Sequence, residues 1–188
     1  MSLKITGGLL KGRQLRFKHS ENTRPTESIV RQAIFNICGQ DLSGINFLDL
    51  FAGSGIMGFE ALSRRADHCT FVEKDQSKAQ QLKENAHLLG VYATATIIQA
   101  DAVSYIAQAT SQYQIVFIDA SYDNYDEQGE FIHRLIDQLV SNVSKEGYIF
   151  IEERFSKIRL NQPYVFEALE HLSSRKYGNC LLHHYRKI

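Results

Sequence analysis

Residues 47–58 constrain the fold of this chain more than any other stretch, because they join an apolar run directly to a glycine-rich turn. The run Phe-Leu-Asp-Leu-Phe is typical of a buried parallel strand. It ends at Gly53-Ser54-Gly55 and leads into an amphipathic segment at 56–65. Glycine suits such a turn because a Cβ would restrict the backbone angles and block a ligand's close approach. The order strand, glycine turn, helix predicts a nucleotide-type pocket at the carboxyl end of a sheet.

The glycine turn leaves two ligands open. The spacing Gly53-x-Gly55-x-x-Gly58, with Glu73 further along, matches a dinucleotide fingerprint and by itself indicates NAD. Asp49 favours another ligand, because a pyrophosphate repels a carboxylate, whereas an amino group and a sulfonium attract one. We expect Asp49, at the end of the strand, to face that ligand. The segment therefore resembles motif I of the class I S-adenosylmethionine (SAM) methyltransferases, and a glycine turn without any ligand is the alternative.

Composition bounds the class of protein. A chain of 188 residues is long enough for one domain, or one domain with an appendage. Its apolar runs fall short of the roughly 20 residues of a membrane span, and its first residues lack the apolar core of a signal peptide. Cys38, Cys69 and Cys180 are odd in number and far apart, so we expect buried free thiols and neither a disulfide framework nor a metal site. These features predict a cytoplasmic protein.

The formal net charge of zero conceals an uneven distribution. Residues 1–40 carry seven Lys or Arg against two acidic side chains, a balance of +5, and residues 154–188 have the same balance. The segment between them carries −10. Basic clusters are typical of a polyanion partner, with ordinary solvated surface as the alternative.

The spacing of apolar residues predicts alternating strands and helices after residue 40. Strands are expected in the apolar run before Gly53 and at 69–72, 94–99, 115–118 and 148–151, and helices at 56–65, 75–89 and 130–140. Two C-terminal strands, 166–177 and 180–186, are expected to pair antiparallel with a turn at Gly178-Asn179. This order predicts an α/β fold with a doubly wound, mostly parallel, Rossmann-like sheet.

The first 40 residues are expected to form an appendage to that sheet. Residues 5–17 predict a small β-ribbon, because glycines interrupt short basic and apolar stretches. Arg24-Pro25-Thr26 predicts the start of a helix that ends at Gly39, with Thr26 able to cap it. The predicted organisation is therefore an appendage at 1–40 and a nucleotide-binding domain at 41–188.

Four acidic residues follow predicted strands: Asp49, Glu73, Asp101 and Asp119. Ligands of such sheets bind at the carboxyl ends of the strands, so these carboxylates are expected on one rim. Glu73 suits the hydroxyl groups of a ribose. Asp101, followed by Ala102, suits the exocyclic amine of adenine, with a helix N-cap as the alternative for Asp101.

The chain resembles the RsmD family of bacterial 16S ribosomal RNA (guanine-N2)-methyltransferases. Three segments match the family's N-terminal signature: Ile5-Thr6-Gly7-Gly8-x-x-Lys11-Gly12-Arg13-x-Leu15, Arg24-Pro25-Thr26 and Val30-Arg31-x-x-Ile34-Phe35-Asn36. A fourth matches its cofactor loop: Asp49-x-Phe51-Ala52-Gly53-Ser54-Gly55-x-x-Gly58-x-Glu60-Ala61-Leu62-Ser63-Arg64. The resemblance implies a seven-stranded class I methyltransferase sheet, SAM as the cofactor, and one guanine of small-subunit RNA, in an assembled particle, as the target. It also implies that the basic N-terminal ribbon contacts RNA.

The resemblance assigns residues to each role. The implied SAM contacts are Asp49, Phe51, Ala52, Gly53, Ser54, Gly55, Glu73, Lys74, Asp101, Ala102 and Asp119. The implied substrate contacts are Lys11, Arg13, Arg16, Arg24, Thr26 and Ser121, and the implied catalytic residues are Asp119, Ala120 and Tyr122. A monomer without metal or membrane contact is expected.

The catalytic tetrapeptide departs from the family pattern, since residues 119–122 read Asp-Ala-Ser-Tyr where the family has Asp-Pro-Pro-Phe/Tyr. The Asp119 carboxylate and the Ala120 carbonyl can still accept hydrogen bonds from a guanine amine, and Tyr122 can stack on the base. The rigidity of two prolines is lost. Two alternatives therefore stay open: methylation of another planar nitrogen, such as adenine N6 or a glutamine amide, and a non-catalytic RNA-binding protein of ribosome assembly.

Overall fold

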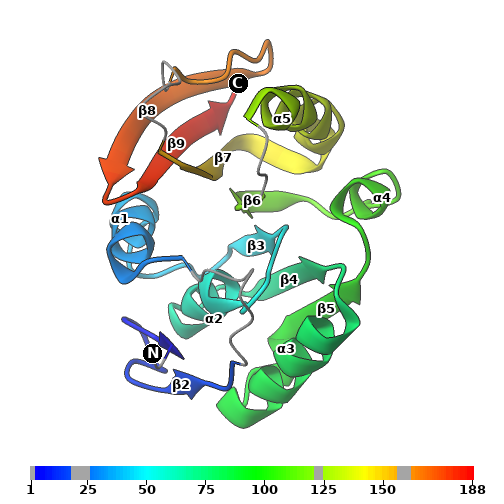
Figure 1. Cartoon of the computed structure of the whole chain (residues 1–188). Coiled ribbons are helices and arrows are strands. Elements are labelled where there is room, and N and C mark those ends of the chain that lie inside the picture. The colour runs from blue at the N-terminus through cyan, green and yellow to red at the C-terminus, as the bar shows by residue number, and fades with distance from the viewer. Residues whose placement is uncertain (1–2, 18–25, 121–124, 156–161) are drawn as a thin grey trace.

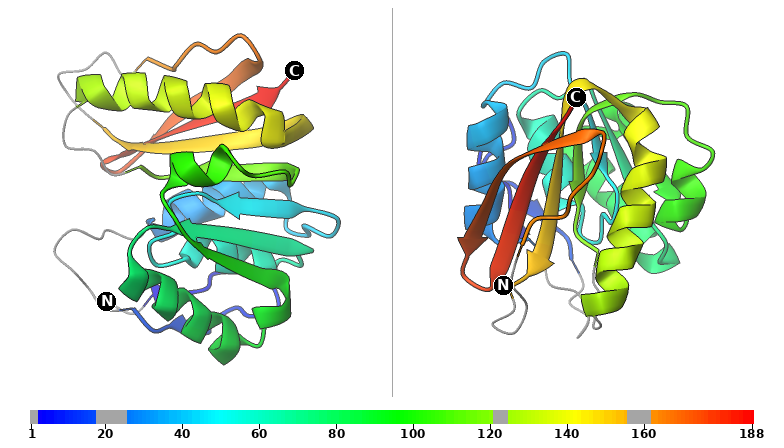
Figure 2. Two further views of the ribbon diagram at one scale, coloured as in Figure 1. Left: turned by 90° about the vertical axis from the view of Figure 1, so that its right-hand side faces the viewer. Right: turned by 90° about the horizontal axis from the view of Figure 1, so that it is seen from above.

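A seven-stranded sheet with helices on both faces forms the body of the protein (Figures 1 and 2). The computed structural model describes residues 3–17, 26–120, 125–155 and 162–188, and the side chains of 125–128 are outside that description. The strand order is β5-β4-β3-β6-β7-β9-β8. Strands β3 to β7 run parallel to one another, and β9 runs antiparallel to both β7 and β8. The predicted doubly wound sheet with an antiparallel C-terminal pair is confirmed.

The strands and helices follow one another in the predicted order. The sheet contains β3 (Asn46–Asp49), β4 (His68–Glu73), β5 (Ala95–Gln99), β6 (Tyr113–Ile118), β7 (Val143–Arg154), β8 (Leu169–Tyr177) and β9 (Cys180–Lys187). The helices are α1 (Ser28–Cys38), α2 (Ile56–Ser63), α3 (Gln76–Leu89), α4 (Ala102–Ile106) and α5 (Tyr125–Leu139), with short 3-10 turns η1 (Tyr92–Thr94) and η2 (Val140–Asn142). The strands β1 (Leu3–Lys4) and β2 (Gln14–Leu15) form a separate antiparallel ribbon.

Two apolar layers, one on each face of the sheet, stabilise this arrangement. Successive side chains of a strand point to opposite faces, so Phe47 packs with α1, α2 and α3, whereas Leu48 packs with α4 and α5. Both side chains are fully buried. The central strands are apolar along most of their length because both of their faces are covered.

The structure corrects three details of the sequence prediction. Thr26 does not cap α1: the N-cap is Glu27, which makes no side-chain capping bond, while the Thr26 carbonyl accepts a hydrogen bond from Arg31. Helix α4 was not predicted, because five residues are too few to show helical spacing. Helix α5 begins at Tyr125 instead of about 130, since its first turn contains the polar residues 126–129.

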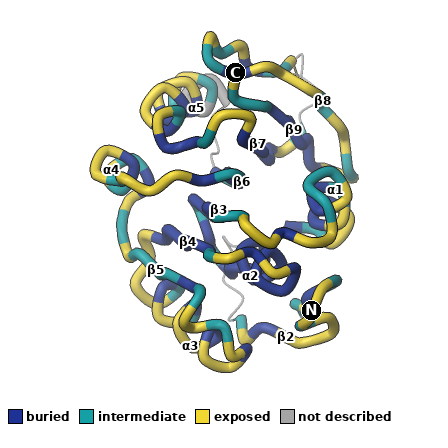
Figure 3. Tube along the Cα trace, turned by 180° about the vertical axis from the view of Figure 1, so that it is seen from behind, coloured by how far each residue is buried: buried dark blue, intermediate teal, exposed yellow. Residues whose placement is uncertain are grey.

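The N-terminal ribbon is fastened to two helices of the sheet layer. Leu9 N–H donates to the carbonyl of Ser63 at the end of α2 over 2.7 Å. The amide side chain of Asn85, on α3, accepts from the backbone N–H of Arg16 and donates to its carbonyl, both over 2.9 Å. All eight residues of α2 are buried as a result, while the outer face of α3 remains exposed (Figure 3).

A buried carboxylate joins the ribbon, α1 and α2. Glu60 is fully buried and accepts hydrogen bonds from the backbone N–H of Thr6 over 2.6 Å, from Arg31 over 3.3 Å and from Arg64. The Arg31 guanidinium also donates to the carbonyl of Lys4 over 3.1 Å. A buried charge needs such partners to offset its desolvation, so the position of the ribbon depends on this cluster.

Candidate cofactor and catalytic site

The glycine loop between β3 and α2 has the backbone angles that its sequence predicts. Gly53 and Gly55 have φ angles of 51° and 74°, in the left-handed region where a side chain is strained. Gly55 is the N-cap of α2, and its N–H donates to the Ala52 carbonyl over 2.6 Å. Ser54 is buried, with its hydroxyl accepting from the N–H of Ile56 over 3.4 Å. The loop therefore offers backbone, with no bulky side chain, at the carboxyl end of β3.

Glu73 fixes the loop from the neighbouring strand. One carboxylate oxygen accepts from Gly53 N–H over 2.9 Å, and the other accepts from Asp75 N–H over 2.8 Å. The side chain is 8% exposed at the end of β4. Each oxygen of an ionised carboxylate has a second acceptor position, so Glu73 can hold the loop and still accept from two hydroxyl groups.

Asp49 differs from its expected orientation toward the ligand. Its side chain is only 2% exposed and accepts a hydrogen bond from Gly58 N–H, inside α2, over 3.1 Å. Burial raises the pKa of Asp49 to about 8, the Gly58 bond opposes this increase, and the nearby Glu73 carboxylate adds to it. Asp49 thus links β3 to the helix that follows the loop.

Gly58 explains how that helix packs so closely. A Cβ at this position would lie 2.3 Å from a ring carbon of Phe71 and 2.6 Å from the sulfur of Cys69, both on β4. The third glycine of the pattern is therefore required for helix–sheet packing, as in other nucleotide-binding loops.

Three further predicted cofactor residues follow the ends of β4 and β5. Asp101 is exposed at the end of β5 and caps α4, accepting from Val103 and Ser104 N–H over 3.0 and 3.2 Å. The N-cap alternative is thus correct for one oxygen of Asp101. Lys74 is exposed, and Ala102 is buried at the first position of α4.

The catalytic segment begins where β6 ends, directly beside β3. Asp49 and Phe117 are paired in neighbouring parallel strands, and Asp119 lies two residues beyond Phe117. Asp119 is half-buried, and Ala120 is buried in the apolar layer shared with α5. Ser121 and Tyr122 lie outside the described residues.

An aromatic contact connects the cofactor loop with α5. The ring of Phe51 meets that of Phe131 edge-on at a centroid distance of 6.2 Å. Phe51 precedes the glycine loop, and α5 follows the catalytic segment. The contact therefore packs the start of the cofactor loop against the helix that follows the catalytic segment.

Three of the predicted substrate residues lie on the N-terminal ribbon and its ends, and a fourth, Thr26, lies just before α1. Lys11, Arg13 and Arg16 are exposed, and the guanidinium of Arg13 donates to the Leu88 carbonyl of α3 over 2.9 Å. Thr26 is buried beside Arg31. Arg24 lies outside the described residues.

Two further carboxylates at the rim were missed by the sequence prediction. Glu152 and Glu153 are buried near the end of β7, where they follow an apolar run as the other rim acids do, so the same signal could have found them. Glu153 accepts from the hydroxyl of Tyr164 over 2.7 Å and lies 3.2 Å from a ring nitrogen of His183. The other ring nitrogen of His183 lies 2.7 Å from the Ser174 hydroxyl.

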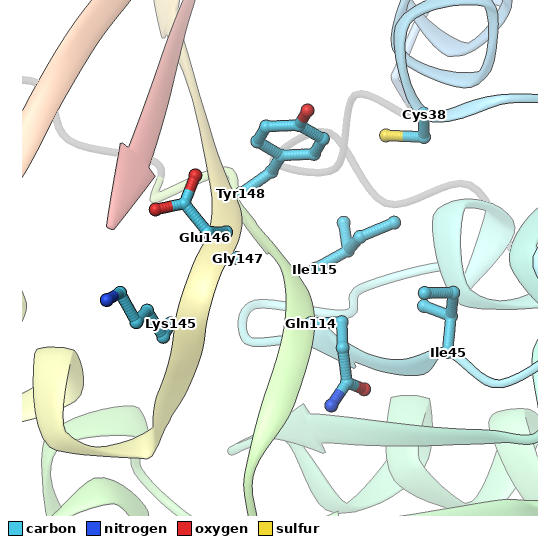
Figure 4. A pocket seen from close by; sticks show the side chains of 8 residues that line it. All are labelled: Cys38, Ile45, Gln114, Ile115, Lys145, Glu146, Gly147 and Tyr148. Carbon is cyan, nitrogen blue, oxygen red and sulfur yellow. The ribbon is translucent and has the colours of Figure 1, made fainter. Parts of the chain in front are cut away.

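A hollow of about 210 Å³ lies at the opposite ends of the strands (Figure 4). It is lined by Ile45, Ile115, Glu146 and Tyr148, among others, at the amino ends of β3, β6 and β7. Ligands of open α/β sheets bind at the carboxyl ends, so this hollow is separate from the candidate site. Among the residues described, no group of His, Cys, Asp and Glu could hold a metal ion, and no helix is long and apolar enough to cross a membrane.

The sheet order, the glycine loop and the row of rim acids define a class I methyltransferase. The family described as "Conserved hypothetical protein 95" matches residues 3–186, and this chain belongs to that family, the RsmD family. Ribosomal RNA small subunit methyltransferase D of Escherichia coli K12 is 38% identical over 120 residues, covering 64% of this chain and 60% of the relative. The enzyme of the same name from Buchnera aphidicola (Acyrthosiphon pisum) is 33% identical over 152 residues, covering 79% and 76%.

Solved structures share the whole fold. The structure of yhhF from Escherichia coli has a TM-score of 0.85 at 28% identity, covering 100% of this chain and 98% of that one. An RNA methyltransferase from Salinibacter ruber, in complex with S-adenosyl-L-homocysteine, has a TM-score of 0.65 at 15% identity, covering 87% and 94%. At that identity the likeness concerns the fold alone.

Proposed function

We propose that this protein transfers the methyl group of SAM to the exocyclic N2 of a guanine in 16S ribosomal RNA. The observation that carries the proposal is the glycine loop that Glu73 fixes, one strand away from Asp119 at the same edge of the sheet. Membership of the RsmD family, whose curated relatives are named for small-subunit RNA, gives the substrate.

The loop and its acids fit SAM. Gly53 leaves room for close approach, since the nearest atom that a Cβ there would meet among the described residues, its two chain neighbours apart, is the Phe51 carbonyl oxygen at 3.9 Å. Glu73 can accept from both ribose hydroxyls through its second acceptor positions, and Asp101 can accept from the adenine amine with the oxygen that does not cap α4. When bound, SAM supplies an electrophilic methyl group on a sulfonium, whose positive charge the acidic rim stabilises.

Asp119 and Ala120 position the nucleophile. The exocyclic amine of guanine is a weak nucleophile because its lone pair is delocalised into the ring. Hydrogen bonds from its N–H groups to the Asp119 carboxylate and the Ala120 carbonyl localise that lone pair and align it for in-line attack. The contribution is orientation and pre-organised electrostatics rather than strong-base catalysis. Tyr122 stacks on the base, a contact worth about 1–3 kcal/mol.

The N-terminal ribbon supplies an RNA contact. Lys11 and Arg16 are exposed on a segment that two helices hold in place, so their charges are available to phosphates. The substrate is an assembled small subunit or its precursor, and the enzyme acts as a cytoplasmic monomer.

Methyl transfer from labelled SAM to unmodified small subunits and to their naked RNA tests this function, with modified nucleosides identified by mass spectrometry. N2-methylguanosine is the expected product. N6-methyladenosine or a labelled protein glutamine would show that the protein methylates another planar nitrogen instead of guanine N2. SAM binding without methylation, on substrates that a Pro-Pro relative modifies, would favour the non-catalytic RNA-binding alternative.

A further inference from the structure

The basic residues of the C-terminal β8–β9 hairpin differ in their partners from one end of the hairpin to the other. At the open end, Arg186 forms ion pairs with Glu146 over 3.3 Å and with Glu170 over 2.5 Å. The ammonium group of Lys187 donates to the carbonyls of Val140 and Val143 over 2.7 and 2.6 Å. These two charges are therefore already engaged within the protein.

The turn end of the hairpin carries three basic side chains that differ from these two in their partners. Arg154, Arg175 and Lys176 are exposed, and among the described residues none of them forms an ion pair. The ammonium group of Lys176 lies 3.6 Å from the centroid of the Phe155 ring. Phe155 N–H donates to the carbonyl of Asn179 over 2.8 Å, which ties the end of β7 to the turn. Arg175 and Lys176 are successive residues of β8 and lie on its opposite faces, with Arg154 on the same face as Arg175. We call these three residues, which share the turn end of the hairpin, the turn cluster.

The turn cluster lies at the same edge of the sheet as Asp119. Strand β6 ends at Ile118, which pairs with Ile151 of the parallel strand β7. Asp119 follows Ile118, and β7 continues past Ile151 to Arg154, so Asp119 and Arg154 lie at the same edge of the sheet. Arg154 pairs with Cys180, at the start of β9 and next to the turn. Figure 1 shows this end of the hairpin beside α1. Three strand spacings separate β6 from β8, a distance of about 14 Å.

Other titratable side chains lie near the turn. A Cβ added at Gly178 would lie 3.4 Å from a carboxylate oxygen of Glu27, so one acidic side chain faces the turn. His184 is buried on the face that Arg175 shares, and burial, with a contribution from the charge of Arg175, lowers its pKa to about 4. His184 is therefore neutral at physiological pH. Glu152 and Glu153 also lie near this end, one strand away from Arg175 and Lys176 across β9, but both are buried. Among the described residues at the turn end, the exposed charges are those of the turn cluster.

We propose that the turn cluster binds the phosphate backbone of the RNA substrate, a few nucleotides from the target guanine. The inference rests on the proposed function. Exposed cations that form no ion pair contribute to affinity by releasing the counterions of phosphates. Such contacts fix the register of the RNA and carry no sequence information, so the turn cluster positions the substrate while the catalytic segment selects the base. The cluster and the N-terminal ribbon would hold the RNA at two places around the site.

The test compares Arg175→Gln with Arg186→Gln, which remove the same charge from opposite ends of one hairpin. A triple variant, Arg154→Gln/Arg175→Gln/Lys176→Gln, amplifies the effect. Affinity for unmodified small-subunit RNA is measured by filter binding between 50 and 200 mM salt, together with SAM affinity, kcat and the KM for RNA.

Each lost phosphate contact should reduce the slope of log affinity against log salt by about 0.7–0.9. Arg175→Gln is therefore expected to lose about one contact, and the triple variant about 2–3 units of slope and on the order of 100-fold in affinity at 0.1 M salt. The KM for RNA should rise, with kcat at saturating RNA and SAM affinity retained. Arg186→Gln should match the wild type in slope.

Equal slopes for the wild type, Arg175→Gln and the triple variant would overturn the inference, as would equal losses for Arg175→Gln and Arg186→Gln. If the wild type methylates RNA and the turn variants match it in RNA affinity and KM, the role of the turn cluster is contradicted and the proposed function is not. A wild-type protein that neither binds nor methylates RNA contradicts the proposed function, and the inference with it.

Discussion

The buried carboxyl group of Asp49 makes the stability of this protein depend on pH in an unusual direction. An aspartic acid in an unfolded chain has a pKa of about 3.9. In the folded protein, burial beside α2 raises the pKa of Asp49 to about 8. Between these values the folded state binds one more proton than the unfolded state, so the free energy of unfolding falls as pH rises. The slope from this one group is about 1.4 kcal/mol per pH unit.

Asp49→Asn should remove that dependence. An asparagine has nearly the same shape, can accept the Gly58 hydrogen bond and does not ionise. Relative to the variant, the wild type should lose about 4 kcal/mol of stability between pH 5 and pH 8. Urea unfolding of both proteins at the two pH values measures this difference and cancels the intrinsic cost of the substitution.

Asp101→Asn is the matched control, because it makes the same change at an exposed N-cap where asparagine is equally suitable. It should leave the pH profile of stability close to that of the wild type. Parallel profiles for the wild type and Asp49→Asn would refute the reasoning. So would a wild type that gains stability over the variant as pH rises, because that result requires an Asp49 stabilised in its ionised form.

Three other substitutions, two of them with a control variant, test the packing and the chemistry. Glu60→Gln removes the carboxylate charge that contacts the buried Arg31 and Arg64 and should cost about 3–5 kcal/mol in urea unfolding. Asp41→Asn, at an exposed ion pair, should have no measurable cost, and equal costs would contradict the role of the Glu60 cluster. Gly58→Ala should destabilise by about 1–3 kcal/mol through overpacking against β4. In contrast, Gly129→Ala on α5, where a Cβ would meet a ring carbon of Tyr164 at 4.0 Å, should stabilise by about 0.5–1 kcal/mol, and equal stabilisation by both substitutions would show that helix propensity and not space decides. Asp119→Ala should lower kcat by about 100-fold or more with SAM affinity nearly unchanged, and an equal loss of both would remove its role toward the guanine amine.

Much of the fold followed from local patterns in the sequence. The apolar run at 47–51 and the glycines after it could be interpreted directly, because the backbone angles of the turn require glycine and buried parallel strands require apolar side chains. Glu73 and Asp101 could be placed on one rim from their position after a strand, since the carboxyl ends of parallel strands meet at one edge. The short helix α4 escaped detection because it spans less than two turns.

The orientation of each carboxylate, however, was decided by tertiary structure. Asp49 and Glu73 look alike in sequence, as single acids at the ends of apolar runs. The packing of α2 buries Asp49 against Gly58, while the loop leaves both oxygens of Glu73 on backbone N–H groups at the rim. The partners of the hairpin charges cannot be predicted from the sequence either, because Arg175 and Arg186 are the same residue type eleven positions apart. Only the packing of β7, β8 and β9 brings Arg186 to its ion-pair partners and leaves Arg175 exposed. Local sequence determines which residues form strands, turns and helices, because those choices depend on near neighbours. Charge state and pairing depend on residues far away in the chain, which only the folded structure brings together.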